Sequence, residues 1–236
     1  MGRIMAKAGH TTYMTSVERI LGGVLFVIYL LVLPFVTAPL FTMLEQLMGQ
    51  AISDHVRNMI YYYVLFAVTL LTFWNFLGRT TSYFLSSAGR TLGAVCMGLV
   101  AFYGLNELSY RLLRLVLSGH ANLNDMTVSA QIADAPRSTI FIVVFLAPFV
   151  EEVLFRGYVF GNLREHSRTA AYIVSCLLFA FLHVWQFAVV SRSLTYFLLM
   201  LQYLVPGLVL AWTYERSGTL WGSILVHAFV NALAVL

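Results

Sequence analysis

Long apolar runs separated by short polar stretches dominate the chain. Seven runs come close to or exceed the roughly 20 apolar residues that a helix needs to cross the hydrocarbon core of a bilayer. They lie at 20–44, 58–78, 92–117, 138–163, 169–188, 194–214 and 219–236. Because lipid offers no hydrogen-bond partner to backbone N–H and C=O groups, each spanning run must be helical. The pattern therefore predicts an all-α, polytopic transmembrane bundle.

Composition supports a membrane environment. Hydrophobic residues make up 60% of the 236 residues and charged residues only 10%, whereas soluble domains carry about 25% charged residues. A soluble globule with so few charges could not cover its surface with polar groups. We therefore expect a multi-pass integral membrane protein with one domain over 1–236, in which helices without a motif occupy 20–137 and a functional core occupies 138–236.

The basic residues predict how the spans are oriented. The net charge of +4 is small and scattered, so we expect the lipid bilayer as a partner and no nucleic acid. The apolar run after the polar residues 1–19 is expected to be a retained helix and not a cleaved signal. With a cytoplasmic N-terminus, eight basic residues face the cytoplasm and three face the other side, which favours this orientation. The two sets are Arg3, Lys7, Arg19, Arg79, Arg90, Arg164, Arg168 and Arg216, against Arg57, Arg137 and Arg192.

Two adjacent carboxylates and an arginine lie within the fourth run, just after Pro148, which can kink the helix. Glu152 and Arg156 are four residues apart, so they share a helix face and can pair. Glu151 lies about 100° away around the helix and is left without that neutralising partner. A free carboxylate at membrane depth suits a general base. The alternative is a salt-bridge network at the end of the helix.

Two further pairs with a spacing of four lie in later runs. Phe179 and His183 share one face of the fifth run, where the phenyl ring can fix the orientation of the imidazole. His227 and Asn231 share one face of the last run and offer two donors for a developing oxyanion. Each pair also fits a packing role, because His and Asn hydrogen-bond across helix interfaces in membranes. If the three faces converge, the cavity holds the groups needed to activate a water molecule.

Polar and helix-breaking residues outside these groups are interpreted as structural. Glu107 and Arg111 are four apart and are expected to pair with each other. Pro206 and Gly207 interrupt the sixth run, as a kink or as a gate for substrate. The polar stretch 118–137 is expected to be a lid or a connection.

The three motifs together resemble a known family. Glu-Glu-x-x-x-Arg at 151–156, Phe-x-x-x-His at 179–183 and His-x-x-x-Asn at 227–231 occur in this order within apolar helices. They are similar to the CPBP family of CAAX proteases and bacteriocin-processing enzymes, also called the Abi family, whose best-known members are type II CAAX prenyl endopeptidases. The resemblance covers about 138–236 and implies a helical bundle of seven to eight spans with a polar intramembrane cavity.

The resemblance also implies roles for the motif residues. It implies an intramembrane endopeptidase in which Glu151 and His183 activate a water molecule. His227 and Asn231 would form the oxyanion hole. Phe179 would orient the site through the motif that it shares with His183. The two motif residues that would position the site are Glu152 and Arg156.

The involvement of a metal is left open by the sequence. Glu151, His183 and His227 offer the three ligands of a catalytic zinc site. The His-Glu-x-x-His spacing of zinc proteases is absent from the sequence. We therefore favour a glutamate-type reaction that requires no cofactor, with a divalent metal such as zinc as the alternative.

The expected substrate is a membrane-embedded or membrane-associated peptide or protein. The short chain and small loops resemble bacterial members of the family, which implies a bacterial cytoplasmic membrane and a role in peptide maturation, self-immunity or regulated proteolysis. A non-catalytic scaffold or bacteriocin immunity protein is one alternative. A proton or ion transporter is another, because buried Glu and His residues can relay protons, but the chain shows no inverted repeat.

Overall fold

Helices make up the part of the chain that the structure describes, and no strand occurs among residues 14–116, 123–192 and 194–235 of this computed structural model. The first half contains α1 (Ser16–Val27), the π-helical η1 (Ile28–Val32), α2 (Leu33–Met48), α3 (Asp54–Thr72), α4 (Trp74–Ser86), α5 (Ala88–Val116) and α6 (Leu123–Asp134). The second half contains α7 (Pro136–Phe141), the π-helical η2 (Ile142–Leu146), α8 (Ala147–Glu152), the π-helical η3 (Val153–Phe160), α9 (Gly161–Arg164), α10 (Arg168–Leu182), α11 (Trp185–Val190), the 3-10 helix η4 (Leu194–Leu199), α12 (Met200–Ser217) and α13 (Leu220–Val235). The predicted all-α class is confirmed.

Several of these helices are long and apolar enough to cross a membrane. Within the described residues four qualify, and the bent pair α3–α4 makes a fifth if it is counted as one span. The helices α10 and α13 are apolar but shorter. The predicted count of seven to eight spans is therefore not confirmed. The four qualifying helices are Ser16–Met48, Ala88–Leu112, Pro136–Arg164 and Tyr196–Ser217.

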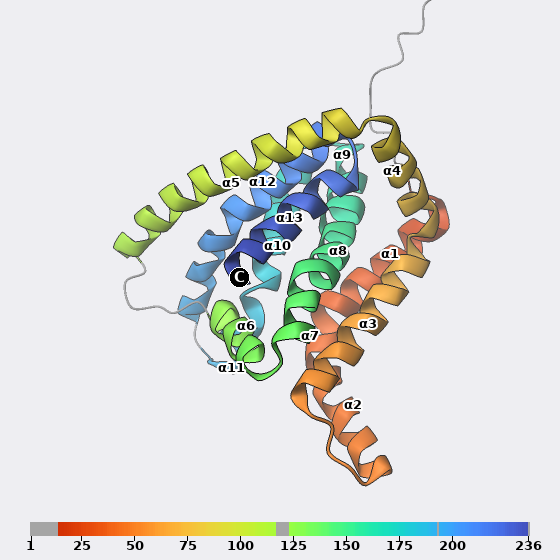
Figure 1. Cartoon of the computed structure of the whole chain (residues 1–236), viewed down its shortest axis with the longest axis vertical. Coiled ribbons are helices and arrows are strands. Elements are labelled where there is room, and N and C mark those ends of the chain that lie inside the picture. The colour runs from red at the N-terminus through yellow and green to blue at the C-terminus, as the bar shows by residue number, and fades with distance from the viewer. Residues whose placement is uncertain (1–13, 117–122, 193, 236) are drawn as a thin grey trace, which may run out of the picture.

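The helix formed by η2, α8 and η3 runs through the middle of the bundle (Figure 1). It contacts α10 and α13 on one side and α1 and α3 on the other. The long helix α5 packs against α12 and α13 at the edge of the molecule. Outward faces carry large apolar side chains such as Ile20, Val24 and Val100, which are 69%, 54% and 76% exposed. Such faces suit contact with lipid tails.

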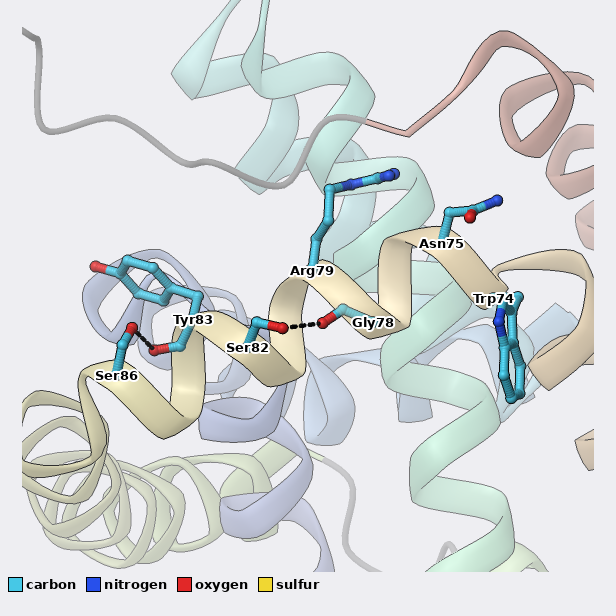
Figure 2. Close-up of a pocket in the computed structure, with 7 residues that line it drawn as sticks. All are labelled: Trp74, Asn75, Gly78, Arg79, Ser82, Tyr83 and Ser86. Atoms are coloured by element: carbon cyan, nitrogen blue, oxygen red, sulfur yellow. Dashed lines mark hydrogen bonds between the residues drawn. The ribbon is translucent and has the colours of Figure 1, made fainter.

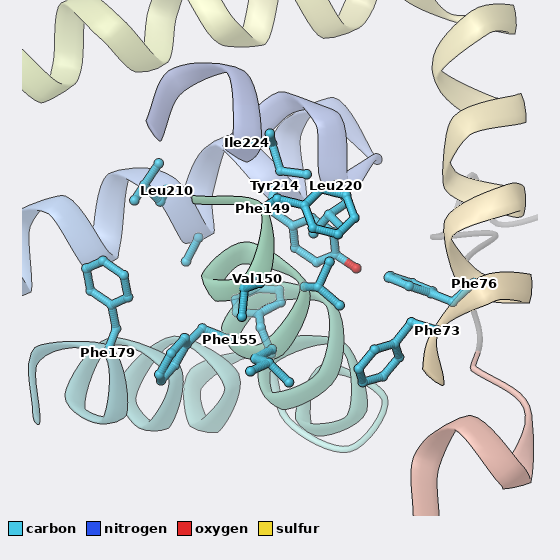
Figure 3. Packing of buried hydrophobic residues seen from close by; sticks show 14 of the residues in the cluster. Phe73, Phe76, Phe149, Val150, Phe155, Phe179, Leu210, Tyr214, Leu220 and Ile224 are labelled. Carbon is cyan, nitrogen blue, oxygen red and sulfur yellow. The ribbon is translucent and has the colours of Figure 1, made fainter. Parts of the chain in front are cut away.

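Buried aromatic side chains join these helices. Figure 3 shows side chains from the α3–α4 junction, the central helix and α10, α12 and α13 gathered around Val150, which is fully buried. Phe155 of η3 packs edge-on against Phe179 of α10, with ring centroids 5.6 Å apart. Phe26 of α1 packs against Phe155 from the other side at 5.4 Å. The central helix is thus held by aromatic contacts on both of its flanks.

The span predicted at 58–78 is not one continuous helix, because the chain bends by 81° between α3 and α4. The carboxylate of Glu18, which is 3% exposed, accepts a hydrogen bond from the Phe76 N–H at 2.7 Å. It also accepts one from the Arg79 guanidinium at 3.2 Å. The first N–H groups of a helix lack helical partners, so this buried carboxylate stabilises a new helix start at α4.

Three other expectations concern polar or helix-breaking residues of the described structure. The helix α6 occupies most of the polar stretch 118–137, of which 118–122 lie outside the described residues. The helix α12 continues through Pro206, so the helix is not interrupted there, while a kink or a gate at this point stays a prediction. Glu107 and Arg111 pair as predicted, with Nε and Oε1 2.6 Å apart, and both side chains are exposed.

Charged side chains gather at the ends of the bundle. Glu215 at the end of α12 accepts hydrogen bonds from Arg164, Arg168 and Tyr172. Arg19 donates to Glu165 at this same end. Arg57 pairs with Glu45 near the α2–α3 connection, at the opposite end (Figure 1). This distribution matches the predicted two-sided division of charge, while the direction of insertion stays a prediction.

Candidate active site

The backbone of the central helix switches between α and π geometry around the acidic pair. In the π-helical η2, each N–H bonds the carbonyl five residues earlier, as Ala147 does to Ile142. Pro148 follows and has no N–H, so the carbonyl of Val143 loses its partner in that ladder. The side-chain amide of Asn231 donates to this carbonyl at 2.9 Å. Asn231 therefore ties α13 to the interrupted helix.

Glu152 is at the centre of a dry ion-pair network. Its Oε1 accepts from Arg156 Nη1 at 2.8 Å, as the spacing of four predicts. The same oxygen bonds His227 Nδ1 at 2.9 Å. Both Glu152 and Arg156 are fully buried. Arg156 Nη2 also donates to the carbonyl of Gly207 at 3.1 Å, which links the network to α12. One carboxylate of the pair is thus neutralised and held in place.

Phe179 lies between the arginine and the histidines. The guanidinium of Arg156 lies 4.2 Å from the centroid of its ring, a cation–π geometry that is favourable when desolvated. The ring also contacts His183 at a centroid distance of 4.6 Å. His183 in turn stacks on Tyr203 of α12 at 4.4 Å. Since α10 ends at Leu182 and turns at His183, the imidazole leaves the helix end, held between two aromatic rings.

Glu151 is the carboxylate without a neutralising partner. The structure describes no hydrogen-bond partner for its buried Oε2. His183 Nε2 lies 3.8 Å and His227 Nε2 lies 3.9 Å from this oxygen. Two imidazoles from different helices therefore converge on one carboxylate oxygen, at distances slightly longer than a hydrogen bond.

Hydrogen bonds at the other ring nitrogens decide which tautomer each histidine adopts. His183 Nδ1 lies 2.8 Å from the carbonyl of Phe179 and His227 Nδ1 lies 2.9 Å from the Glu152 carboxylate. Both partners are acceptors, so both Nδ1 atoms carry the proton. A neutral ring then presents the Nε2 lone pair towards Glu151. The polar cluster can therefore accept protons from a molecule placed between these three groups.

The structure brings the predicted site residues of three distant segments together. Glu151 and Glu152 of α8 and Arg156 of η3 meet Phe179 and His183 at the end of α10. His227 of α13 completes the cluster through its contacts with Glu151 and Glu152. The side-chain N–H of Asn231, by contrast, bonds the backbone of η2.

Three side chains of the cluster are of the types that bind metal ions. Glu151, His183 and His227 face one another at the distances given above. As the side chains lie, the described part of the chain holds no group of three or more His, Cys, Asp or Glu residues arranged to bind a metal ion. The need for a metal stays a prediction, and the roles below are derived from the side chains themselves.

Residues that no motif indicated also surround the site. Tyr203 stacks on His183, and Gly207 offers its carbonyl to Arg156. A Cβ on Gly207 would lie 3.4 Å from Cys176 Cα, so the glycine lets α12 approach α10 closely. The partners of both residues lie on another helix, so the sequence carries no signal for either of these contacts.

A separate surface hollow lies along α4. It has a volume of about 560 Å³ and is lined by Trp74, Asn75, Gly78, Arg79, Ser82, Tyr83 and Ser86. Figure 2 shows these side chains along one helix, with Ser82 and Ser86 bonded to backbone carbonyls one turn earlier. None of the predicted site residues lines this hollow.

Comparison with known proteins agrees with the motifs. Residues 134–233 match the family model described as type II CAAX prenyl endopeptidase Rce1-like. The predicted family resemblance is confirmed. The UPF0177 protein YxdF of Lactococcus lactis subsp. lactis (strain IL1403) is 30% identical over 91 residues, which cover 39% of this chain and 45% of that protein. The chain therefore matches less than half the length of this relative. No solved structure matches the chain.

The family match contains the whole polar cluster, since all three motifs lie within 134–233. Together with the apolar helices, it identifies an integral membrane protein. The helices α1 to α5 lie before the matched segment, although α1 and α3 contact the central helix.

Proposed function

We propose that the chain is an intramembrane endopeptidase that hydrolyses a peptide bond of a membrane-associated or lipid-modified peptide or protein. The observation that carries this proposal is the Glu151 carboxylate, buried and facing two imidazole nitrogens. A buried, unpaired charge is costly. A scaffold therefore has no need to hold a carboxylate beside the lone pairs of two imidazole nitrogens. An active site that binds and deprotonates water has that need.

The first chemical step is attack by water. A water molecule between Glu151 Oε2 and His183 Nε2 can donate one hydrogen bond to each, because both atoms are acceptors. Glu151 takes a proton as the water oxygen bonds the carbonyl carbon of the substrate. The carbonyl electrons move onto the oxygen, and a tetrahedral oxyanion forms. Exclusion of bulk water strengthens each of these interactions.

The second step is collapse of that intermediate. Protonated Glu151 returns its proton to the leaving amine nitrogen as the C–N bond breaks. Glu152 and Arg156 hold His227 in place through the Nδ1 hydrogen bond, and Phe179 supports Arg156 and His183. These are positioning roles.

His227 and Asn231 are proposed to stabilise the oxyanion. Because His227 Nδ1 bonds Glu152, the ring donates towards the cavity only when Nε2 is also protonated. Asn231 has one side-chain N–H left after its bond to the Val143 carbonyl. Both residues therefore contribute less than their motif implies, which leaves room for further donors.

The deciding experiment measures cleavage by the purified full chain in detergent. Fluorogenic peptides and membrane-anchored substrates, with and without a prenyl group, are incubated with wild type, Glu151→Gln and Glu107→Gln. Glu107 is the matched control, because it is an intramembrane carboxylate paired on the exposed surface. We expect Glu151→Gln to lose at least ~10²-fold in kcat, the scale of general-base catalysis, and Glu107→Gln to retain the wild-type rate.

A chelator arm separates the two chemical classes. Unchanged cleavage in the presence of chelator supports the metal-free reaction, whereas loss that is restored by zinc supports a metal site at Glu151, His183 and His227. Full activity of Glu151→Gln would refute the assigned base. Wild-type protein that cleaves nothing, yet captures a membrane peptide, would favour the scaffold function. Proton flux in liposomes that depends on Glu151 would favour a transporter.

A further inference from the structure

His183 lies where the regular backbone of α10 ends. The helix spans Arg168–Leu182, and His183 is its C-terminal cap. The imidazole Nδ1 donates to the carbonyl of Phe179 at 2.8 Å, which is one of the last carbonyls of the helix, where helical N–H partners run out. This single hydrogen bond does not by itself fix the plane of the ring. A further contact is needed to hold Nε2 towards Glu151.

The ring of Tyr203 supplies that contact. It stacks on the His183 imidazole with centroids 4.4 Å apart and an angle of 23° between the two planes. The ring of Phe179 also contacts the imidazole, at 4.6 Å, but is tilted by 52°. A nearly parallel neighbour opposes rotation of the imidazole out of its plane, because the rotation drives the ring edge into the neighbouring ring. Tyr203 therefore restrains the imidazole plane more directly than Phe179 does.

The position of Tyr203 is set by the way α12 packs on α10. Gly207 lies one turn after Tyr203, on the same face of α12. Its carbonyl accepts the hydrogen bond from Arg156 Nη2 at 3.1 Å. A Cβ on Gly207 would lie 3.5 Å from Phe179 Cδ1, so this face of α12 lies directly against α10. One face of α12 thus contacts both the ion-pair network and the imidazole.

A small hydrophobic cluster also joins Tyr203 to the turn that carries His183. Buried Val184 and Leu199 form this cluster apart from the main core, and Tyr203 packs against it. Val184 directly follows His183, and Leu199 ends η4 just before α12. The N–H of Val184 donates to the Phe181 carbonyl at 3.1 Å, which closes the turn. The turn and the start of α12 are therefore packed as one unit.

Stacking leaves the reactive edge of the imidazole open. A stacked ring covers the face of its neighbour, whereas both imidazole nitrogens lie on the edge. The His183 side chain is 14% exposed, and its Nε2 lies 3.8 Å from Glu151 Oε2. A water molecule between these two atoms is therefore not displaced by the stack. Its hydrogen bond to Nε2 depends on the imidazole staying in place, since a small misplacement in a reacting geometry can cost ~10²-fold in rate.

We propose that Tyr203 is a positioning residue of the active site, whose ring holds the His183 imidazole so that Nε2 points at the water bound by Glu151. This inference rests on the proposed hydrolytic function. Tyr203 acts through His183 and contacts no reacting atom, so no proton passes through its hydroxyl. The stacked ring carries the role, and a residue outside all three motifs thereby determines the geometry of a motif histidine.

The test keeps or removes the ring. Tyr203→Phe retains it, whereas Tyr203→Leu replaces it with an apolar side chain that still packs against Val184 and Leu199. Trp212→Leu is the matched control, because Trp212 is a half-buried aromatic residue of the same helix, about two and a half turns further along. In the cleavage assay we expect kcat to fall ~10–10²-fold in Tyr203→Leu, with KM and melting temperature close to wild type. Tyr203→Phe and Trp212→Leu are expected to cleave at the wild-type rate.

The tautomer of His183 separates positioning from general destabilisation. NMR of the histidine ring nitrogens in isotope-labelled protein reports it, and the signals of His183 are assigned by their loss in His183→Gln. We expect a single Nδ1–H form in wild type and in Tyr203→Phe. In Tyr203→Leu the imidazole turns more freely, so we expect the proton to be shared between the two nitrogens.

Cleavage at the wild-type rate by Tyr203→Leu, while Glu151→Gln is inactive, would overturn this inference and leave the proposed function standing. An equal loss in Tyr203→Phe would assign the effect to the hydroxyl, and an equal loss in Trp212→Leu would assign it to α12 in general. Either result would overturn the inference, as would a lower kcat in Tyr203→Leu with an unchanged His183 tautomer. Wild-type protein without hydrolytic activity would overturn both.

Discussion

Two adjacent glutamates have different environments, and the proposed chemistry depends on this difference. Glu152 and Arg156 are fully buried and bonded to each other. Glu151 Oε2 has no protein partner in the described structure and faces two imidazoles. Neighbouring side chains on a helix point about 100° apart, so a step of one residue separates the bonded carboxylate from the one that is proposed to react.

The two carboxylates should respond differently to neutralisation. Glu152→Gln leaves Arg156 buried without its counter-charge, and breaking a buried pair costs about 3–5 kcal/mol. We expect a markedly lower melting temperature for Glu152→Gln and a nearly unchanged one for Glu151→Gln. Thermal unfolding of the purified variants in detergent measures both. Equal destabilisation by the two changes would contradict the assigned roles.

Among the elements, the central helix is defined by its departure from regular α geometry. Pro148 removes the donor that would bond the Val143 carbonyl in the π-helical ladder, and Asn231 replaces it from α13. Asn231 therefore belongs to a motif and also has a local structural partner. Its contributions to stability and to catalysis can be separated experimentally.

A double-mutant cycle measures the structural contribution. Asn231→Ala leaves the Val143 carbonyl without a partner, which costs about 1–3 kcal/mol for a buried group. Pro148→Ala restores a backbone N–H, so the cost of Asn231→Ala should be smaller in that background. Chemical unfolding of the four proteins gives the coupling. Strictly additive effects would indicate that Asn231 does not compensate for the proline.

Gly98 lies where α5 packs closely against α12 and α13. A Cβ at Gly98 would lie 2.5 Å from Thr213 Oγ1 and 3.1 Å from Val226. Gly93, in the same helix, has open space around it. Small residues allow helices to approach closely in membranes.

We therefore expect Gly98→Ala to lower the melting temperature and Gly93→Ala to leave it unchanged or raise it, because alanine favours the helix. Thermal unfolding of the two variants side by side is the measurement. A melting temperature for Gly98→Ala at or above that of Gly93→Ala would show that α5 can shift to fit the added methyl group without loss of stability.

For the molecule as a whole, charge at the two ends predicts the direction of insertion. The cluster around Glu215 and the Arg19–Glu165 pair mark the end expected in the cytoplasm. Arg57 and Glu45 mark the opposite end. The excess of basic residues at the first end favours a cytoplasmic location for it.

Cysteine labelling of intact cells tests this topology. Ser53 directly precedes α3, Ser86 ends α4, and both are exposed. The α2–α3 and α4–α5 connections lie at opposite ends of the bundle (Figure 1). Each serine is replaced in turn by Cys in a chain lacking Cys96 and Cys176. A membrane-impermeant maleimide is expected to label Ser53→Cys from outside and to label Ser86→Cys only after the membrane is opened. The reverse pattern would place the N-terminus outside.

Local geometry made part of the protein predictable from sequence. Apolar runs gave the helical class, because lipid requires internally bonded backbone. A spacing of four residues was sufficient for the Glu152–Arg156 pair, the Glu107–Arg111 pair and the contact of Phe179 with His183, since such residues are neighbours on one helix.

The tertiary structure decided what depends on contacts between distant segments. Buried Glu18 bends the chain at α4, although the hydrophobic pattern continues through this point. The convergence of His183 and His227 on Glu151 brings together residues of three different helices. A sequence pattern reports which face of a helix is apolar. Which helix covers that face, and which side chains then meet across it, follows only from packing the whole chain.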